Sequence, residues 1–397
     1  MDGRPEYDFD FHGDALNHVF HDYKQMHAKC PVSWSEHYGG FWSITSYDDI
    51  QRAEHDWGTY SVAPSMILPS FATERPMIPL DIDPPALTAY RQILLPFFRP
   101  QRVNTLTPRA HELAKRLLDD YGSASTLDAT RFARMLPTML FSEYAGFPLE
   151  DAEQFDVWVE DIVFARTEDL SVALKAADDV YAYFTDLIAR RRREEPGPDV
   201  ISGLLTADFQ GRGLTDDEML DICYLLFLAG LETTAGTIRA SLWHLAQHPD
   251  DLARLVADPS RVPTAAEEFL RALSPVQAMA RTLKQDTVVG GVPMKAGERV
   301  ALVFGAANRD PARFEAPNEI RLDRVDNPHA AFGIGAHRCL GSNLARREVV
   351  VAITEFIARY PTFELAEPAP WHSIGPLSLR VQYSAEFESR QISLGDI

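Results

Sequence analysis

The chain is poor in cysteine and in positive charge. Only three cysteines occur among 397 residues, Cys30, Cys223 and Cys339, and they lie far apart. This spacing offers no disulfide framework and is typical of a reducing compartment. The 38 Lys and Arg residues are outnumbered by 58 Asp and Glu residues, which gives a formal net charge of −20. Such a charge argues against nucleic acid or an anionic membrane surface as a partner.

The sequence also lacks a long apolar run. Its most apolar stretch, residues 222–231, is much shorter than the roughly 18 residues that a membrane span needs. Residues 1–14 are acidic and polar, so we expect neither a signal peptide nor a membrane anchor. With 46% hydrophobic residues, the chain can bury a sizeable core. We therefore expect a soluble, cytoplasmic protein.

The most informative stretch is FGIGAHRCLG, residues 332–341. It places a single thiol, Cys339, in a loop punctuated by glycines and followed by an apolar helical pattern that runs to about residue 360. Glycines allow tight turns and the close approach of a flat partner. The helix N-terminus and neighbouring cations would stabilise a thiolate, which makes Cys339 a candidate metal ligand at neutral pH. A lone cysteine in a turn is more often structural, but four spaced features in one decapeptide favour the ligand.

A second distinctive stretch lies about a hundred residues earlier. Thr215 and Glu218 form a predicted capping box for a helix that continues to about residue 247, roughly 50 Å long. Its middle reads AGLETT, residues 229–234. Glycine and consecutive β-branched residues are poor helix formers, so a local bulge or kink is expected there. Glu232 and Thr233 form an acid–alcohol pair suited to proton relay, although a threonine bonded to the preceding turn is the commoner meaning.

The pattern F-G-x-G-x-H-x-C-x-G resembles the haem-binding loop of the cytochrome P-450 monooxygenases. Further motifs match in the same order, so the resemblance covers nearly the whole chain. It implies one domain over residues 1–397, mainly α with a small β-rich lobe (roughly residues 30–60, with strands near 277–305 and 373–383). Haem b would lie between the long distal helix and a proximal Cys loop. The resemblance makes Cys339 the axial ligand of the haem iron, with Phe332, Gly333, Gly341 and Ala229 also against the haem.

The resemblance also assigns roles to other side chains. Arg91, Arg281 and His337 would hold the haem propionates, while Leu87 stands where relatives often have a further histidine donor. Thr233 would be the oxygen-side hydroxyl and Glu232 the proton relay. Glu268, Arg271 and Arg324 would form a buried ionic network for folding and haem retention. The candidate substrate-pocket residues are Met66, Phe71, Leu225, Leu228, Met279 and Leu377.

The activity that follows from the resemblance is insertion of one oxygen atom from O2 into an apolar small molecule. A terpenoid, a fatty acid, a steroid and an aromatic compound suit the apolar pocket equally well. Arg75 could meet a substrate carboxylate or could be an exposed loop arginine. Electrons would come from a separate iron–sulfur ferredoxin and its reductase, which would dock on Arg91, Arg338, Arg346 and Arg347. The alternatives are a peroxide-driven peroxygenase and a non-catalytic haem sensor or carrier.

Local patterns predict the remaining elements. We expect a hairpin from residues 32–37 and 41–45, a helix capped by Ser46, and a long loop over 61–79. Asp83-Pro84-Pro85 predicts a helix start, and helices are predicted at 109–120, 151–165 and 171–193. Thr264 and Glu267 suggest a second capping box. Residues 277–281 are expected to be extended, residues 287–293 to form a hairpin and residues 299–304 a strand. Residues 311–329 should be irregular, and 373–381 should form a turn and a strand.

Overall fold

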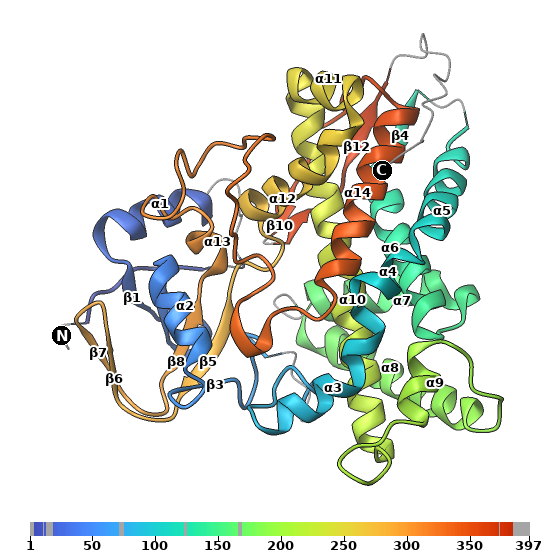
Figure 1. The fold of residues 1–397 in the computed structure, drawn as a ribbon. Helices are drawn as coiled ribbons and strands as arrows, with labels where there is room; N and C mark the ends of the chain where they lie inside the picture. Colours follow the sequence, from blue (N-terminus) through green and yellow to red (C-terminus); the bar gives the residue numbers. More distant parts are fainter. Residues whose placement is uncertain are drawn as a thin grey trace.

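The computed structural model describes residues 4–10, 12, 19–70, 75–122, 125–165, 169–372 and 374–383. Most of these residues are helical and lie on the right in Figure 1, beside a smaller β-rich lobe on the left. This arrangement confirms the predicted mainly α fold with a small β-rich lobe.

The elements have the following bounds. The helices are α1 (Phe20–Lys29), α2 (Tyr47–His55), α3 (Ala86–Phe98), α4 (Pro100–Asn104), α5 (Thr107–Asp119), α6 (Ala129–Ala145), α7 (Ala152–Phe164), α8 (Leu170–Arg191), α9 (Val200–Leu205), α10 (Asp216–Gln247), α11 (Pro249–Ala257), α12 (Val262–Leu273), α13 (Phe304–Ala307) and α14 (Ser342–Arg359). The strands are β1 (Val32–Ser35), β2 (Phe41–Ile44), β3 (Tyr60–Ser61), β4 (Thr126–Asp128), β5 (Met279–Leu283), β6 (Thr287–Val289), β7 (Val292–Met294), β8 (Arg299–Leu302), β9 (Glu364–Leu365), β10 (Trp371–His372), β11 (Gly375–Pro376) and β12 (Arg380–Gln382).

The β-rich lobe joins two parts of the chain that are distant in sequence. β1 and β2 form the predicted hairpin, with Val32 opposite Ile44. β8 then pairs parallel to β2, β5 pairs antiparallel to β8, and β3 closes the five-stranded sheet. The sheet has its own small apolar core, which includes the fully buried Trp42, Ile44 and Leu302. Because of this pairing, α2 and β5 lie in the same lobe although more than two hundred residues separate them.

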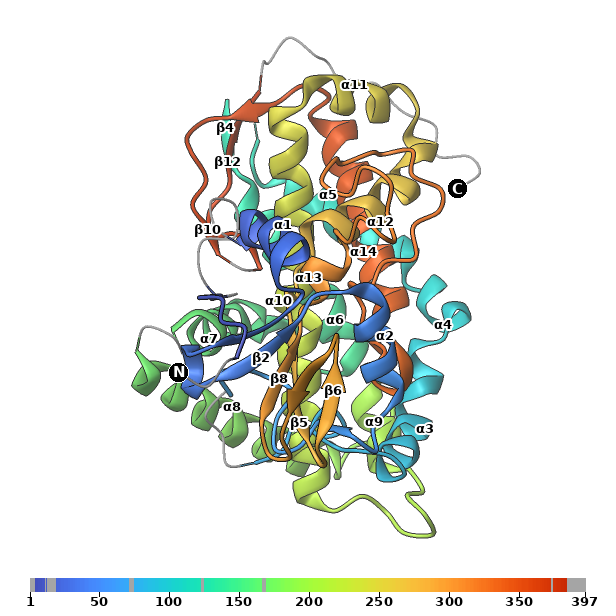
Figure 2. The same cartoon turned by 90° about the vertical axis from the view of Figure 1, so that its left-hand side faces the viewer.

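Helix α10 runs through the centre of the helical part and packs mainly on α6 and α14 (Figure 2). Its N-terminus carries the predicted capping box: the Glu218 amide donates to Thr215 Oγ1 at 3.2 Å, and the Thr215 amide donates to Glu218 Oε2 at 2.7 Å. Within the described residues, α10 is the one helix long and apolar enough to cross a membrane, yet 78% of its apolar window is buried inside the protein. Its apolar composition is therefore that of a core helix.

Several local predictions need correction. Helix α10 is continuous through Ala229–Thr234, so no break interrupts it there. Helix α6 was missed because it is buried on most sides and contains Pro137, which together hide its period. The predicted capping box of α12 is wrong, because the helix begins at Val262 without a side-chain cap. The Glu267 carboxylate cannot fold back onto the helix start, since it binds Arg346 and His329.

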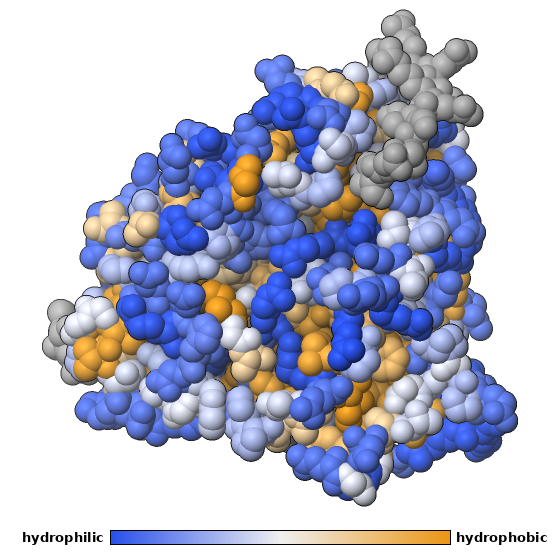
Figure 3. Space-filling view, in the orientation of Figure 1, coloured by the Kyte–Doolittle hydropathy of each residue, from blue (hydrophilic) through white to orange (hydrophobic). Residues whose placement is uncertain are grey.

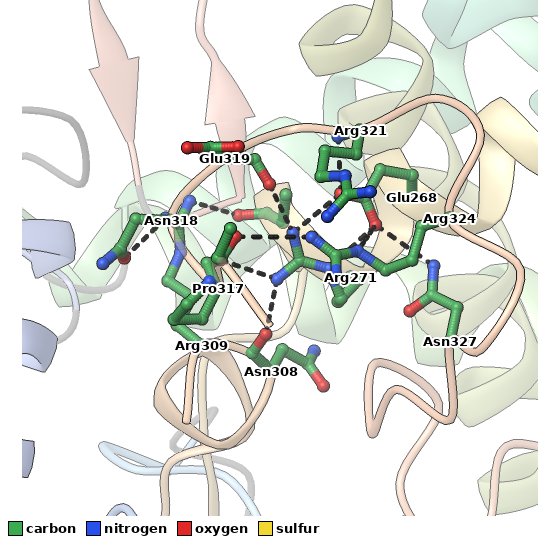
Figure 4. A network of polar contacts seen from close by, with 12 residues as sticks. Glu268, Arg271, Asn308, Arg309, Pro317, Asn318, Glu319, Arg321, Arg324 and Asn327 are labelled. Atoms are coloured by element: carbon green, nitrogen blue, oxygen red, sulfur yellow. Dashed lines mark hydrogen bonds and ion pairs between the residues drawn. The ribbon is translucent and has the colours of Figure 1, made fainter. Parts of the chain in front are cut away.

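The carboxylate of Glu268 organises the irregular segment 311–329 (Figure 4). It accepts two hydrogen bonds from Arg271 at 2.8 Å each and one from Arg324 Nε at 3.0 Å, and all three side chains are buried. The Arg321 amide also donates to it. Arg271 in turn donates to the carbonyls of Asn308, Pro317 and Glu319. One ion pair on α12 thus fixes the backbone of the segment that leads into the Cys loop.

Replacing Glu268 with Gln should destabilise the protein by about 3–5 kcal/mol, because it leaves two arginines buried without a countercharge. Urea unfolding followed by circular dichroism would measure the loss. Glu153→Gln is the matched control, since its 3.0 Å pair with Arg131 is exposed on both sides and should contribute little. Equal losses in the two variants would contradict the organising role of Glu268.

Candidate active site

The loop that carries Cys339 is closed by its own backbone and rests on helix α2. The Cys339 amide donates to the Phe332 carbonyl at 2.8 Å. Gly333 and Gly335 adopt positive φ values of 66° and 68°, which favour glycine. A Cβ at Gly335 would also lie 2.5 Å from the Glu54 carbonyl oxygen, so only glycine fits there. At Gly341, by contrast, a Cβ would meet no protein atom within 4 Å, which leaves open space beside the loop.

The thiol of Cys339 is solvent-accessible, yet it lies deep enough that burial raises its pKa. Both properties hold for an atom in the wall of an internal hollow. The Gly341 amide and the Arg91, Arg338 and Arg346 cations act in the opposite direction but do not outweigh burial. The groups expected to stabilise a thiolate are therefore present, but burial opposes them. A cation bound directly to the sulfur is needed, because a coordinating thiol loses its proton outright.

The surroundings of Cys339 fit a metal that brings most of its own ligands. No group of three or more His, Cys, Asp or Glu side chains that could hold a metal occurs in the part of the chain that the structure describes. The iron of a haem has such a ligand set and needs one protein thiolate from this side. The contrast with Cys223 supports this assignment: burial raises its pKa to about 12 and no donor or cation opposes the effect.

Three basic side chains from separate elements gather near the same loop. His337 Nε2 is buried and has no hydrogen-bond partner among the described residues. Burial and the charges of Arg281 and Arg91 lower the pKa of His337 to about 4, so its ring is neutral at neutral pH. A buried donor without an acceptor is costly, and two cations beside it favour an anionic acceptor. This arrangement fits the carboxylate of a haem propionate.

The residue that holds Arg281 was not predicted from the sequence. Arg281 Nη2 donates to Glu54 Oε1 at 2.8 Å, and both side chains are almost completely buried. Burial raises the pKa of Glu54, while Arg281 lowers it. Glu54 lies on the same face of α2 as the buried Tyr47 and Ile50, at helical spacing. That spacing was the signal in the sequence from which the burial of Glu54 could have been predicted. Leu87, at the position of the missing histidine, is simply buried in α3.

The middle of α10 has an accessible strip within an otherwise buried helix. Ala229 is exposed and Thr233 is half-buried, whereas Leu225 and Leu228 before them are buried. The Thr233 hydroxyl donates to the Ala229 carbonyl at 3.1 Å. This is the back-bonding expected of a threonine in a helix, and the helix stays continuous here. The accessible strip exposes one hydroxyl and one backbone carbonyl to a hollow inside the protein.

Glu232 points away from this strip into a buried ion pair. Its Oε1 accepts a hydrogen bond from Arg239 Nη2 two turns later, and both side chains are buried. A further charged pair borders the carboxylate. Burial raises the pKa of Asp156 and the charge of Glu232 adds to this effect, whereas burial lowers the pKa of Arg134 but is outweighed by Asp156 and Glu232. Arg134 and Asp156 are themselves paired at 2.6 Å across α6 and α7. Arg239 was not predicted from the sequence, because a pairing of residues seven positions apart leaves no short motif.

The predicted pocket residues come from four regions. Met66 is buried in the loop before α3, and its carbonyl accepts from the Ala280 amide at 2.7 Å, which places it beside Met279 on β5. Leu377 is 42% exposed, and Phe71 lies outside the described residues. Arg75 binds Asp221 and Asp217 of α10 at 2.6 and 2.9 Å, so its guanidinium pins the loop to the helix.

A buried carboxyl that the sequence analysis did not single out lies on α14. Glu348 is buried, and desolvation raises its pKa well above the usual range, so it holds its proton. The Thr234 side chain hydrogen-bonds to it, while Glu348 Oε1 has no partner within the described part of the chain. A neutral acid therefore sits between α14 and α10, next to the acid–alcohol pair.

The predicted basic docking patch is smaller than expected. Arg346 binds both carboxylate oxygens of Glu267, at 2.6 and 2.9 Å, and covers the Phe332 ring. Arg91 is turned inward, where its Nη2 donates to the Arg338 carbonyl at 2.9 Å. Arg338 and Arg347 remain near the surface, Arg347 with one bond to Asn104. The face that carries the Cys loop is hydrophilic with apolar patches between the charged residues (Figure 3).

Comparisons with known proteins agree on one family. The family model described as Cytochrome P450 matches residues 150–373. The chain is 36% identical over 330 residues to the probable cytochrome P450 127A1 of Sinorhizobium fredii, covering 83% of this chain and 78% of that protein. It is 35% identical over 335 residues to the mycinamicin IV hydroxylase/epoxidase of Micromonospora griseorubida, covering 82% and 84%. The structure of the cytochrome P450 PksS of Bacillus subtilis 168, from bacillaene polyketide synthase, superposes with a TM-score of 0.86 at 31% identity, covering 95% of this chain and all of that one.

Replacing Glu267 with Gln should remove a stabilisation that depends on pH. Burial would raise the pKa of Glu267, but bonds from His329 and Arg346 outweigh it and lower the pKa to about 2. A depressed carboxyl pKa contributes stability above the unfolded value of 4.5 and loses it as pH falls toward 2. The difference in urea midpoint between the protein and the variant should thus be constant above pH 4.5 and shrink below it. A difference that grows on acidification would contradict this pairing.

Proposed function

The chain belongs to the cytochrome P450 family of haem-iron monooxygenases, and from this premise we propose that it inserts one oxygen atom from O2 into an apolar small molecule. The observation that carries the proposal is the pairing of an accessible thiol with an accessible hydroxyl, both inside the protein. Cys339 supplies the thiol from the loop before α14, and Thr233 supplies the hydroxyl from α10, which packs on α14.

The cofactor in this proposal is haem b, held by residues from both sides. Cys339 is the axial ligand, with Phe332, Gly333 and Gly341 beside it and Ala229 on the α10 side. His337, Arg91 and Arg281 bind the propionates, with Arg281 shared between a propionate and Glu54. When bound, the haem activates oxygen, and the thiolate favours cleavage of the O–O bond. The protein's part is to hold these groups, exclude water and deliver protons.

Proton delivery falls to the acid–alcohol pair. Thr233 Oγ1 is the group accessible to the hollow, and its bond to the Ala229 carbonyl leaves both oxygen lone pairs free to accept. Glu232, one residue earlier, is buried with Arg239 beside the Arg134–Asp156 pair. We assign Glu232 the transfer of protons from that charged cluster and Thr233 their placement at the oxygen side.

The substrate is an apolar small molecule of the terpenoid, fatty acid, steroid or aromatic class. Leu225, Leu228, Met66 and Met279 offer hydrocarbon and thioether surface, which desolvates such a molecule without a strong directional contact. Arg75 is committed to two carboxylates of α10 and is therefore a poor partner for a substrate carboxylate. We assign the protein to the cytoplasm as a single domain over residues 1–397.

Replacing Thr233 with Ala should uncouple oxygen consumption from oxygen insertion. Without the hydroxyl, protons are misplaced and reduced oxygen leaves as hydrogen peroxide, so the peroxide released per oxygen consumed should rise about tenfold or more. The reduced, carbon monoxide-treated variant should keep the red-shifted Soret band of a thiolate-bound haem. Cys339→Ser should lose that band. An unchanged peroxide yield in Thr233→Ala would favour the sensor or carrier, and an unaltered band in Cys339→Ser would reject the ligand assignment.

Electrons come, in this proposal, from a separate ferredoxin and its reductase. Arg338 and Arg347 remain near the surface close to the Cys loop and suit an acidic partner, since opposite charge speeds association. Arg346 is excluded because it is paired with Glu267.

Charge reversal at Arg347 should therefore slow reduction by ferredoxin and weaken its dependence on salt. Stopped-flow reduction of Arg347→Glu would measure both effects. The control is Arg193→Glu, an exposed arginine that follows α8, which should leave the rate unchanged. Equal rates for the two variants would contradict docking at Arg347.

A further inference from the structure

Arg239 occupies an unusual place on α10. It is among the largest fully buried side chains in the described residues, and it bonds in two directions. Its Nη2 donates to Glu232 Oε1, and its Nε donates to the Pro376 carbonyl of β11 at 2.7 Å. The guanidinium is planar and rigid, so these two acceptors are fixed relative to each other. The proposed proton-relay acid and a backbone group of β11 thus share one side chain.

The turn that contains β11 is pressed directly onto the same face of α10. A Cβ at Gly236 would lie 2.6 Å from both the carbonyl oxygen and Cγ2 of Ile374. A Cβ at Gly375, where φ is +143°, would lie 2.9 Å from the Gly236 carbonyl. Glu232, Gly236 and Arg239 are spaced at i, i+4 and i+7, which places them on one helix face. The turn therefore cannot shift without disturbing the neighbourhood of Glu232.

Leu377, the next residue along this turn, is a candidate member of the substrate-pocket wall. Its amide donates to the Pro370 carbonyl at 2.8 Å, which ties the turn back to the segment before β10. A molecule seated against the turn would push on the Pro376 carbonyl, and the guanidinium would transmit that displacement to the carboxylate of Glu232.

We propose that Arg239 is a positioning residue that couples the pocket wall at β11 to proton delivery by Glu232. This inference rests on the proposed monooxygenase function. It implies that the fit of the substrate against β11 affects the fraction of consumed oxygen that is released as peroxide. Arg239 carries no proton of the relay. Glu232 takes each proton from the side of the Arg134–Asp156 pair and passes it toward Thr233, and Arg239 holds the carboxylate where that transfer occurs.

The first test distinguishes the effect of the positive charge of Arg239 from the effect of its simultaneous bonds to Glu232 and Pro376. Arg239→Lys keeps the positive charge beside Glu232, but a single ammonium cannot reproduce the two bonds of the planar guanidinium to Glu232 and Pro376. Arg239→Met removes both the charge and the two bonds. Holoenzyme is supplied with electrons, and peroxide released per oxygen consumed is measured with the terpenoid, fatty acid, steroid or aromatic compound that shifts the haem Soret band most in the parent. Both variants should release severalfold more peroxide than the parent. Asp251→Asn, which removes the 2.9 Å partner of His244 near the other end of α10, is the control and should match the parent.

A second readout guards against a merely structural effect. Cumene hydroperoxide brings its own electrons and protons, so dye oxidation driven by it bypasses proton delivery. This rate should stay close to that of the parent in both Arg239 variants, and the carbon monoxide band should remain. If Arg239→Met does not hold haem, the peroxide yields of Arg239→Lys and Gly236→Ala decide whether Arg239 is a positioning residue. A hydroperoxide-driven rate that falls in parallel with coupling would overturn the positioning role.

The wall is tested with Gly236→Ala, which forces Ile374 off α10 while leaving Arg239 and Glu232 in place. It should raise the peroxide yield as Arg239→Lys does, and the double variant should be no worse than either single one. Additive effects of Gly236→Ala and Arg239→Lys, or a peroxide yield of Arg239→Lys equal to that of the parent, would show that β11 and Glu232 act independently and would reject the coupling.

The failure of this inference can be distinguished from the failure of the proposed function. If Thr233→Ala also leaves the peroxide yield unchanged, the proposed function itself fails. If only the Arg239 variants leave it unchanged, the inference alone fails.

Discussion

The position of the loop that carries Cys339 depends on the carboxylate of Glu268 on α12. Its contacts with Arg271 and Arg324 hold a segment of the chain that has no regular structure of its own. That segment runs directly into the loop that carries Cys339, so the ion pair on α12 also fixes the position of the loop. The cost of burying these charges is offset because each remaining donor of Arg271 has a backbone carbonyl to bind.

The same rule applies to the buried charges of the active site. Glu54 is paired with Arg281, and Glu232 is paired with Arg239. Glu348 has no cationic partner among the described residues, and desolvation raises its pKa well above the usual range. In each case a side chain on one element fixes a group on another: α2 to β5, α10 to β11, and α14 to α10. Buried polar contacts therefore set the geometry around the hollow, while the apolar core sets the fold.

Signals that lie within one helical turn or one hairpin were readable from the sequence. The capping box of Thr215 and Glu218, the hairpin of β1 and β2, and the glycines around Cys339 were all predicted from local patterns. The box proposed for Thr264 and Glu267 failed because a distant arginine, Arg346, binds the glutamate more favourably. The same pairing removes Arg346 from the predicted docking patch.

The active-site residues that were missed share a cause. Glu54 meets a residue 227 positions away, Arg239 meets a carbonyl 137 positions away, and Glu348 lies on a different helix from its partner Thr234. No local pattern records such contacts, because only the folded chain brings the partners together. For Cys339, the donors that favour a thiolate are visible in the sequence, but the burial that opposes them is a property of the tertiary structure.

The contact between Gly335 and the Glu54 carbonyl has a consequence for the order of assembly. Helix α2 follows a hairpin made early in the chain, and it can seat on the Cys loop only after β8, which is made some 250 residues later, has paired with β2. During synthesis, the N-terminal segment must therefore wait for nearly the whole chain to emerge. The contact between α2 and the Cys loop therefore joins two ends of the sequence, and it forms only after the Cys loop at residues 332–341 has been made.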